Sequence, residues 1–389
     1  MSTRKPGRPR DGSLMHRSIT ILAVVACAAC AQQASAQPAV VEEQVAIDQP
    51  SNLLSTAEPT AMPTSTLTPA FSVAPTANPT SWDPISLTHG GCCPGVFWSG
   101  DSQGVRFIAR PVPTQPASLY GVPRTGGSAR LVVRGPVWYS ADDAYRVTPS
   151  GENVAIERVE DGQQWLIPTS GRAIHFSHGA QKIAWTESSE KVENLDLIHR
   201  SIWISNVDGS TSTSVVTVVG GGFLGWTQND EAILVSGGLR TGGPRGVWRV
   251  PSQGGEPRLL IEAQEVEGAL VSPTGGWLAF FIAFGDDPSR NGVWVIPTGE
   301  GSARQLELFG SYRWRSEGRL LVVPLETNNA GDGLWEFDTT GGIMTRLFAP
   351  GEVEFEIANN DWSVSPDGMY IAFRSAIDYN IWTLPLPAN

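Results

Sequence analysis

Val364-Ser365-Pro366-Asp367-Gly368 opens the stretch that decides the fold, and Met369-Tyr370-Ile371-Ala372-Phe373 and Asn380-Ile381-Trp382 complete it. An apolar residue leads into a tight polar turn, a short apolar strand follows, and a further strand carries a tryptophan. Ser, Pro, Asp and Gly tolerate the dihedral angles of turns. The β-branched and aromatic runs between them are too short and too continuous for amphipathic helices, and they favour strands.

This pattern occurs seven times, about every 44 residues, with its turns starting at Ser99, Ser140, Ser177, Thr227, Ser272, Arg315 and Ser365. A period of this length made of short strands is typical of a β-propeller with one blade per repeat. The last copy ends after its third strand, so we expect Ile85-Ser86-Leu87-Thr88 to supply the missing outer strand. The sequence therefore predicts an all-β, seven-bladed propeller of four-stranded antiparallel blades over residues 85–389. Its ring is closed by the N-terminal strand at about 85–88.

Residues 1–36 have the pattern of an export signal, with a basic end followed by an apolar run, Ile19 to Ala31, that is short for a membrane span. Val24-Val25-Ala26-Cys27 resembles a lipobox, in which Cys27 is acylated and becomes the new N-terminus. Ala34-Ser35-Ala36 fits ordinary signal cleavage, and an uncleaved anchor is a third possibility. We predict export to the cell envelope with a lipid anchor on Cys27, or secretion if the chain is cleaved after Ala36.

Residues 37–84 are rich in Pro, Thr, Ser and Ala, and X-Pro-Thr triplets recur among them. Such a segment cannot bury enough apolar surface to fold by itself. We predict a disordered, extended stalk with polyproline character between the anchor and the propeller.

The net charge of −12 makes the chain a poor nucleic-acid binder. A cationic or polar partner suits the acidic surface, although acidic residues also serve solubility alone. The adjacent Cys92 and Cys93 would meet an oxidising compartment after export. We interpret them as free or partly buried thiols in preference to a strained vicinal disulfide. No further Cys or His lies nearby at the spacing that a zinc site needs.

One catalytic pattern occurs, because Gly100-Asp101-Ser102-Gln103-Gly104 matches G-x-S-x-G. That motif needs a strand, a sharp turn and then a helix, whereas Val105 to Ala109 reads as a strand. Ser102 is therefore interpreted as a residue of the repeated turn. His175 and His178 are three residues apart without further ligands, and the pairs Asp142-Asp143 and Asp286-Asp287 read as solvated loop charges. No catalytic residue, metal site or cofactor is predicted.

The longest connections fall on one face of the predicted ring, and long loops on a rigid scaffold are common binding regions. We predict that this long-loop face binds a peptide or protein, although the loops could equally be solvent-facing connections. Candidate contacts are Glu187, Glu190, Glu193, Asp196, Asp286, Asp287, Arg290, Glu352, Glu354 and Glu356. The chain is predicted to be a monomer.

The stretch Val364 to Phe373 with Ile381-Trp382 resembles the repeat of TolB-like (WD-like) β-propellers, and Val271 to Phe280 with Val293-Trp294 resembles it again. The resemblance covers about residues 85–389 and is weaker in the second, third and sixth copies. It implies an exported bacterial lipoprotein-type propeller and transfers no active site, because its motif is structural. TolB itself has six blades and an α/β domain, so its specific role is not implied.

The predicted function is that of a non-catalytic, membrane-tethered, extracytoplasmic propeller that binds a peptide or protein through the long-loop face. The alternative is a propeller hydrolase, lactonase-like or glycan-acting, with its site at the mouth of the channel. Propellers serve many unrelated tasks, so the fold by itself does not decide between these functions.

Overall fold

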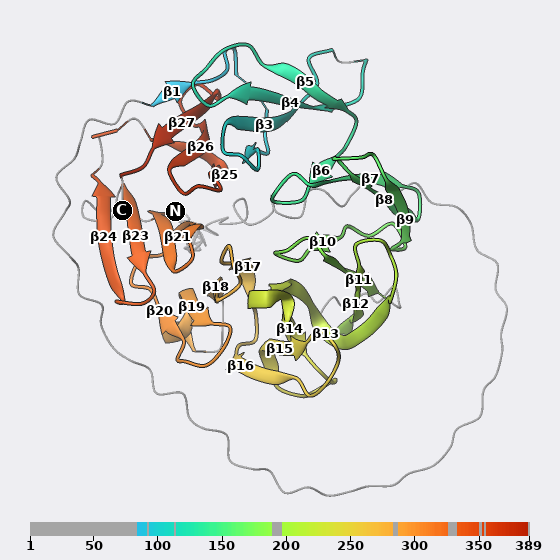
Figure 1. The fold of residues 1–389 in the computed structure, drawn as a ribbon. Coiled ribbons are helices and arrows are strands. Elements are labelled where there is room, and N and C mark those ends of the chain that lie inside the picture. The colour runs from blue at the N-terminus through green and yellow to red at the C-terminus, as the bar shows by residue number, and fades with distance from the viewer. Residues whose placement is uncertain are drawn as a thin grey trace, which may run out of the picture. The chain divides into compact units, whose positions relative to one another are not determined.

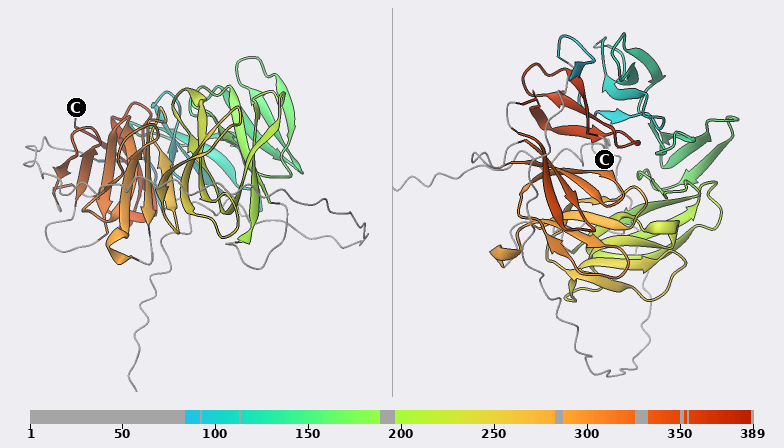
Figure 2. Two further views of the ribbon diagram at one scale, coloured as in Figure 1. Left: turned by 90° about the horizontal axis from the view of Figure 1, so that it is seen from below. Right: turned by 60° about the vertical axis from the view of Figure 1, so that its left-hand side comes forward.

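The computed structural model describes residues 84–91, 93–112, 114–188, 197–282, 287–325, 333–349, 352–353 and 355–387. These residues form antiparallel sheets arranged around a common centre (Figure 1). Viewed from the side, the sheets stand next to one another in a single layer (Figure 2). Within this part of the chain, no helix is long and apolar enough to cross a membrane. The predicted signal and stalk, apart from Pro84, lie outside the described residues.

Five of the described sheets have four strands each. The first two are β2 (Phe97–Trp98), β3 (Gly104–Ala109), β4 (Ser118–Pro123) and β5 (Arg130–Arg134), then β6 (Trp138–Tyr139), β7 (Tyr145–Ser150), β8 (Asn153–Arg158) and β9 (Gln164–Pro168). The next two are β17 (Glu267–Val271), β18 (Trp277–Ile282), β19 (Gly292–Pro297) and β20 (Arg304–Gln305), then β21 (Gly310–Ser316), β22 (Arg319–Pro324), β23 (Leu334–Asp338) and β24 (Ile343–Phe348). The last is β1 (Ile85–Ser86), β27 (Ile381–Pro385), β26 (Tyr370–Ser375) and β25 (Ile357–Val364).

The sixth sheet has seven strands and combines the third and fourth repeats, which we call the joint sheet. It contains β10 (His175–Phe176), β11 (Lys182–Ser188), β12 (His199–Asn206), β13 (Thr213–Trp226), β14 (Ala232–Gly238), β15 (Arg245–Pro251) and β16 (Arg258–Glu262). Two short 3₁₀ helices, η2 (Gln228–Asp230) and η3 (Pro288–Arg290), lie in connections.

The prediction of seven separate four-stranded blades is wrong at the joint sheet. The 14-residue strand β13 pairs with β12 through its first half and with β14 through its second half. Three glycines at positions 220–222 lie where a turn would have separated two blades, but here they continue the strand with shifts in register. A Cβ atom on Gly221 would lie 2.0 Å from the Ser236 carbonyl oxygen, so only glycine permits this close approach of β13 and β14.

The predicted pairing of the N-terminal strand with the last repeat is confirmed. Ile85 pairs with Thr383 and Ser86 with Trp382, so β1 becomes the outer strand of the last sheet. The backbone N–H of Leu87 donates to the Ile381 carbonyl at 2.7 Å and extends the pairing by one residue. Chain segments from both ends of the described region therefore complete one sheet.

The hydrophobic core lies between the faces of neighbouring sheets. One cluster joins Val295 of β19 to Trp314 and Leu320 of the next sheet, and another joins Leu321 and Leu334 to Phe373. Eight described tryptophans are buried: Trp98, Trp185, Trp226, Trp248, Trp294, Trp314, Trp335 and Trp362. Several indole N–H groups bond across the seams between sheets, as Trp314 does to the Leu270 carbonyl at 2.8 Å.

Candidate functional site

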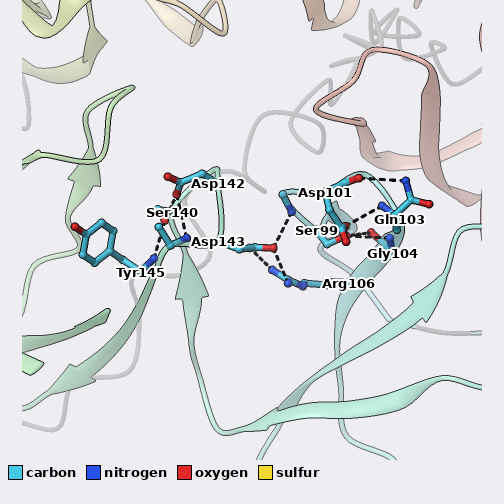
Figure 3. Close-up of polar contacts among 11 residues, drawn as sticks. Ser99, Asp101, Gln103, Gly104, Arg106, Ser140, Asp142, Asp143 and Tyr145 are labelled. Carbon is cyan, nitrogen blue, oxygen red and sulfur yellow. Dashed lines mark hydrogen bonds and ion pairs between the residues drawn. The ribbon is translucent and has the colours of Figure 1, made fainter. Parts of the chain in front are cut away.

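In six of the seven repeats, a Ser or Thr side chain holds the turn after the first strand by accepting a backbone N–H of the same turn. We call the face that carries the seven turns the short-turn face. In the first repeat, the Ser99 hydroxyl donates to Asp101 Oδ1 at 2.6 Å and accepts the Gly104 N–H at 2.9 Å (Figure 3). The hydrogen bond from Ser99, aided by one from the Gln103 backbone, lowers the pKa of Asp101. Equivalent Ser–Asp contacts occur at Ser140 with Asp142 and at Ser365 with Asp367.

Neighbouring turns are also bonded to one another, which fixes the rim of this face. Asp143 accepts the Gly100 N–H at 2.8 Å and a bidentate contact from the Arg106 guanidinium at 2.5 and 2.8 Å (Figure 3). Further along the ring, the Glu317 carboxylate accepts the Ser272 hydroxyl and the Thr274 N–H, both at 2.8 Å. These bonds are charge-assisted, the stronger class of protein hydrogen bond.

Ser102, the serine of the G-x-S-x-G pattern, lies in such a turn, as the sequence predicted. Its side chain is buried, and its hydroxyl accepts the backbone N–H of Asp367 at 3.0 Å. Strand β3 follows at Gly104 in place of the helix that a hydrolase nucleophile requires. Ser102 therefore links the first and last repeats where their sheets adjoin.

A cavity of about 370 Å³ opens among the innermost strands near the short-turn face, and we call it the channel pocket. Its walls come from the ends of β6, β10, β13 and β17, which lie along one side of the common centre in Figure 1. The lining is mostly aromatic and apolar: Trp138, Tyr139, Ile174, Phe176, Phe223, Leu224, Trp226 and Val271, with the polar residues Ser140, His175, Ser177 and His178. Ligand pockets typically combine such walls with a few polar groups and measure about 300–1,000 Å³.

The aromatic rings of the channel pocket hold one another in place. The ring centroids of His175 and Phe223 are 4.9 Å apart, and the rings of Phe223 and Trp226 meet edge-on at 6.2 Å. The Trp226 indole N–H donates to the His175 carbonyl at 3.3 Å, which joins β13 to β10 within the joint sheet. Tyr139 is fixed from behind by the Arg106 guanidinium, 4.6 Å from its ring centroid. The pocket is thus preformed.

The two histidines of the pocket have different surroundings. The protein close to His175 disfavours the charged imidazolium and lowers the pKa of His175, although the side chain still reaches solvent through the pocket. His178 contacts Asp230 through its backbone N–H at 3.1 Å and through Nδ1 at 3.5 Å. Among the described residues, no three His, Cys, Asp or Glu side chains gather as metal ligands would.

Among the described residues, those predicted for the long-loop face do not form one site. Glu187 accepts the Trp185 indole N–H at 3.1 Å, and Glu352 accepts the Ala349 N–H at 2.6 Å. Asp287 is the N-cap of η3 and Arg290 is its last residue, and a hydrogen bond from the Ser289 hydroxyl lowers the pKa of Asp287. Glu356 is exposed. Cys27, Glu190, Glu193, Asp196, Asp286 and Glu354 lie outside the described residues, so their roles stay predictions.

The preferred interpretation of the vicinal cysteines as free thiols is wrong for Cys93, which is disulfide-bonded. The other three cysteines of the chain lie outside the described residues. Cys93 has a left-handed backbone with φ of 62° and packs against the core cluster of the first and last sheets. The bond therefore lies where the two ends of the propeller meet.

Comparisons with known proteins support the fold alone. No protein-family model and no curated protein matches the chain. A crystal structure of oligogalacturonate lyase from Vibrio parahaemolyticus is 9% identical with a TM-score of 0.54, covering 80% of this chain and 99% of that one. An oligogalacturonate lyase in complex with manganese is 13% identical with a TM-score of 0.53, covering 80% and 97%.

A putative TolB from Agrobacterium tumefaciens is also among the matches. It is 15% identical and covers 57% of this chain and 84% of that one, and its TM-score of 0.39 is too low to support an argument. The propeller arrangement is therefore shown, whereas the more specific resemblance to TolB still rests on the repeated sequence.

Proposed function

We propose that this protein is a non-catalytic, extracytoplasmic binding propeller that takes an extended peptide or protein segment at its short-turn face. The channel pocket carries the proposal, because its aromatic walls suit an apolar or aromatic side chain of the partner. Its volume of about 370 Å³ is near the lower end for ligand pockets, so one or two side chains would fill it. In our proposal, the signal at Cys27 and the stalk hold this face away from a membrane.

The polar groups around the pocket support binding over catalysis. A serine nucleophile must be free to pass its proton to a base and to attack the substrate. The Ser140 hydroxyl donates to Asp142 at 2.6 Å but also accepts the Tyr145 N–H at 3.0 Å, and the Ser177 hydroxyl accepts the Lys182 N–H at 3.2 Å. Both hydroxyls thus form hydrogen bonds within their own turns. The hydrolase alternative rests on the likeness of fold, since no contact of the described residues favours it.

The choice of the short-turn face differs from the sequence-based expectation, which placed the partner on the long-loop face. We keep the acidic long loops as a separate binding hypothesis, because their described carboxylates remain candidates for contacts with a cationic partner. The two hypotheses predict opposite outcomes when each face is altered separately, so a single experiment distinguishes them.

The test is selection of a displayed random-peptide library against the full chain, followed by affinity measurements with two variants. Ala141 is exposed at the pocket lining, so Ala141→Trp places an indole over the pocket without removing a core contact. We expect selected peptides to share an aromatic or aliphatic position and to bind this variant at least about tenfold more weakly.

Glu356→Lys is the matched variant on the opposite face, where the exposed side chain can change charge without loss of packing. We expect it to bind the selected peptides with unchanged affinity, and Ala141→Ser to do the same. Loss of binding in Glu356→Lys with full binding in Ala141→Trp would overturn the pocket assignment in favour of the long-loop face. Cleavage of the selected peptides would overturn the non-catalytic role.

The proposed membrane anchor is tested separately. Metabolic labelling with a radioactive fatty acid should mark the wild-type chain and leave Cys27→Ala unlabelled. A mature N-terminus that follows Ala36 would show that the chain is secreted instead.

A further inference from the structure

A second cavity lies next to the channel pocket on the short-turn face, and we call it the outer cleft. It measures about 450 Å³ and lies between the turns of the fourth and fifth repeats. The two cavities are neighbours along the chain, because Trp226 lines the channel pocket and Thr227 lines the outer cleft. An extended segment with a side chain in the channel pocket therefore has a second cavity beside its path.

The charged groups of the outer cleft are mainly carboxylates. Glu231, Glu300 and Glu317 line it together with a single cation, Arg249. Arg249 Nη2 lies 3.6 Å from Glu231 Oε2, so the charges of these two residues largely cancel. Glu300 is exposed and makes no hydrogen bond or ion pair with any described residue. The cleft thus keeps an excess of negative charge toward solvent.

Glu317 is positioned by the protein and does not move freely in the solvent. Its carboxylate accepts the Ser272 hydroxyl at 2.8 Å, the Thr274 N–H at 2.8 Å and the Gly276 N–H at 3.1 Å. A Cβ atom on Gly276 would lie 2.5 Å from Glu317 Oε1, so glycine makes room for the carboxylate at this point. The cleft consequently presents a fixed negative charge as well as mobile ones.

Trp277 provides an aromatic wall in the same cleft. Its side chain is half-buried, packs on the core cluster of the fifth and sixth repeats, and lines the cavity. A guanidinium or ammonium group is attracted to the face of an indole, and surrounding carboxylates add to this attraction. The combination of Trp277 with Glu300 and Glu317 suits a cation better than an anion or an apolar group.

We infer that the outer cleft is a subsite for a basic side chain, arginine or lysine, of the same segment that inserts an apolar side chain into the channel pocket. The inference rests on the proposed function and names the chemistry of the partner. It agrees with the net charge of −12, since a basic partner is attracted to this chain at long range. The predicted partner motif is an aromatic or aliphatic residue separated by a short spacer from a basic residue.

The probes are synthetic peptides with an N-terminal tryptophan, an alanine spacer of increasing length and a C-terminal arginine amide. A matched series carries citrulline, which has the shape of arginine without its charge. Binding to the full chain is measured by fluorescence polarisation of labelled peptides. At the best spacer length we expect the arginine peptide to bind about fivefold more tightly than the citrulline peptide.

Three variants locate the effect. Glu300→Gln and Trp277→Phe should each reduce the preference for arginine, while leaving the affinity for the citrulline peptide within about twofold. Ala141→Trp should weaken both peptides equally, because it blocks the channel pocket and leaves the cleft intact. Raising the ionic strength from about 0.01 M to about 1 M should also reduce the preference.

The outcomes separate the two proposals. Equal affinity for the arginine and citrulline peptides, with both lost in Ala141→Trp, would overturn the basic subsite and leave the channel pocket as the binding site. An arginine preference that survives in Glu300→Gln and Trp277→Phe would place the basic residue elsewhere and also overturn the inference. Absence of binding by every peptide of both series would overturn both proposals.

Discussion

Replacement of Asp143 by asparagine tests whether bonds between neighbouring turns hold the ring together. Asp143 accepts two bonds from the Arg106 guanidinium and one from the Gly100 N–H, all across the seam between the first two sheets (Figure 3). Its backbone is left-handed, with φ of 60°. Asparagine tolerates this conformation, so Asp143→Asn removes the negative charge without adding backbone strain.

The expected loss of stability follows from the burial of the pair. The side chains of Arg106 and Asp143 are 15% and 26% exposed, so water screens the contact only in part. Hydrogen bonds to charged groups contribute about 1.5–3 kcal/mol, roughly twice the contribution of neutral ones. Because asparagine keeps one acceptor oxygen, we expect the free energy of unfolding to fall by about 1–2 kcal/mol. For a domain of this size, Tm should fall by about 2–4 °C.

Thermal unfolding followed by tryptophan fluorescence measures the loss, and hydrogen exchange at the Gly100 amide reports on the seam itself. Asp161→Asn is the matched control, because Asp161 also makes a bidentate contact with an arginine, Arg158, at 3.0 and 2.7 Å. That pair lies within a single hairpin, and its side chains are 35% and 49% exposed. We expect no measurable change in Tm for the control. Equal effects of the two variants would refute the idea that seam bonds stabilise the ring more than local ones.

Three further results are expected. Gly221→Ala should lower the free energy of unfolding by about 1–3 kcal/mol, because its Cβ would meet the neighbouring strand, whereas Gly222→Ala, with open space, should leave it within about 0.5 kcal/mol in denaturant titrations. Hydrogen bonds within its own turn, chiefly from Ser99, lower the pKa of Asp101 from its usual 3.8. The ionised Asp101 therefore contributes its full stabilisation above pH 3.8, and this contribution is lost as the pH falls through the lower pKa of the folded state. The stability difference between wild type and Asp101→Asn should therefore be constant near neutral pH and shrink below about pH 4, whereas a difference that grows there would contradict the assignment. Cys93 should resist alkylation until the protein is reduced, as peptide mass spectrometry can check.

Much of the propeller could be predicted from sequence because its turns and strands are determined locally. The Ser–Asp bonds in the turns at Ser99, Ser140 and Ser365 lie within a few residues, so each copy of the repeat carries its own signal. The incomplete last repeat likewise predicted the pairing of β1 with β27. The joint sheet could not be predicted in this way, because glycines between two strand-forming runs suggest a turn. Whether they form one depends on contacts with β12 and β14.

The candidate site was missed for a related reason. His175 was interpreted only as one of two histidines without further ligands, and nothing in the sequence separates Trp138 and Phe223 from aromatic residues that pack in the core. The space between them depends on how four inner strands are placed around the centre, which no single repeat encodes. A signal was present in the paired aromatic residues that end the inner strands, Phe97-Trp98, Trp138-Tyr139 and His175-Phe176. In the second and third repeats, both members of the pair line the channel pocket.

The short strand β1 also determines how the propeller responds to mechanical force. Any pull on the chain before Pro84 reaches the fold first through Ile85 and Ser86, whose pairing with β27 is only two residues long. Beyond them, the Ile381 N–H bonds to the Thr88 hydroxyl oxygen at 2.9 Å and provides the next resistance. The remaining strands of the last sheet pair over longer stretches, as β26 and β27 do through five residue pairs. Under tension, β1 would detach from β27 before any longer strand separates from its neighbour. The sheet would therefore lose its outer strand first, while the short-turn face stays intact.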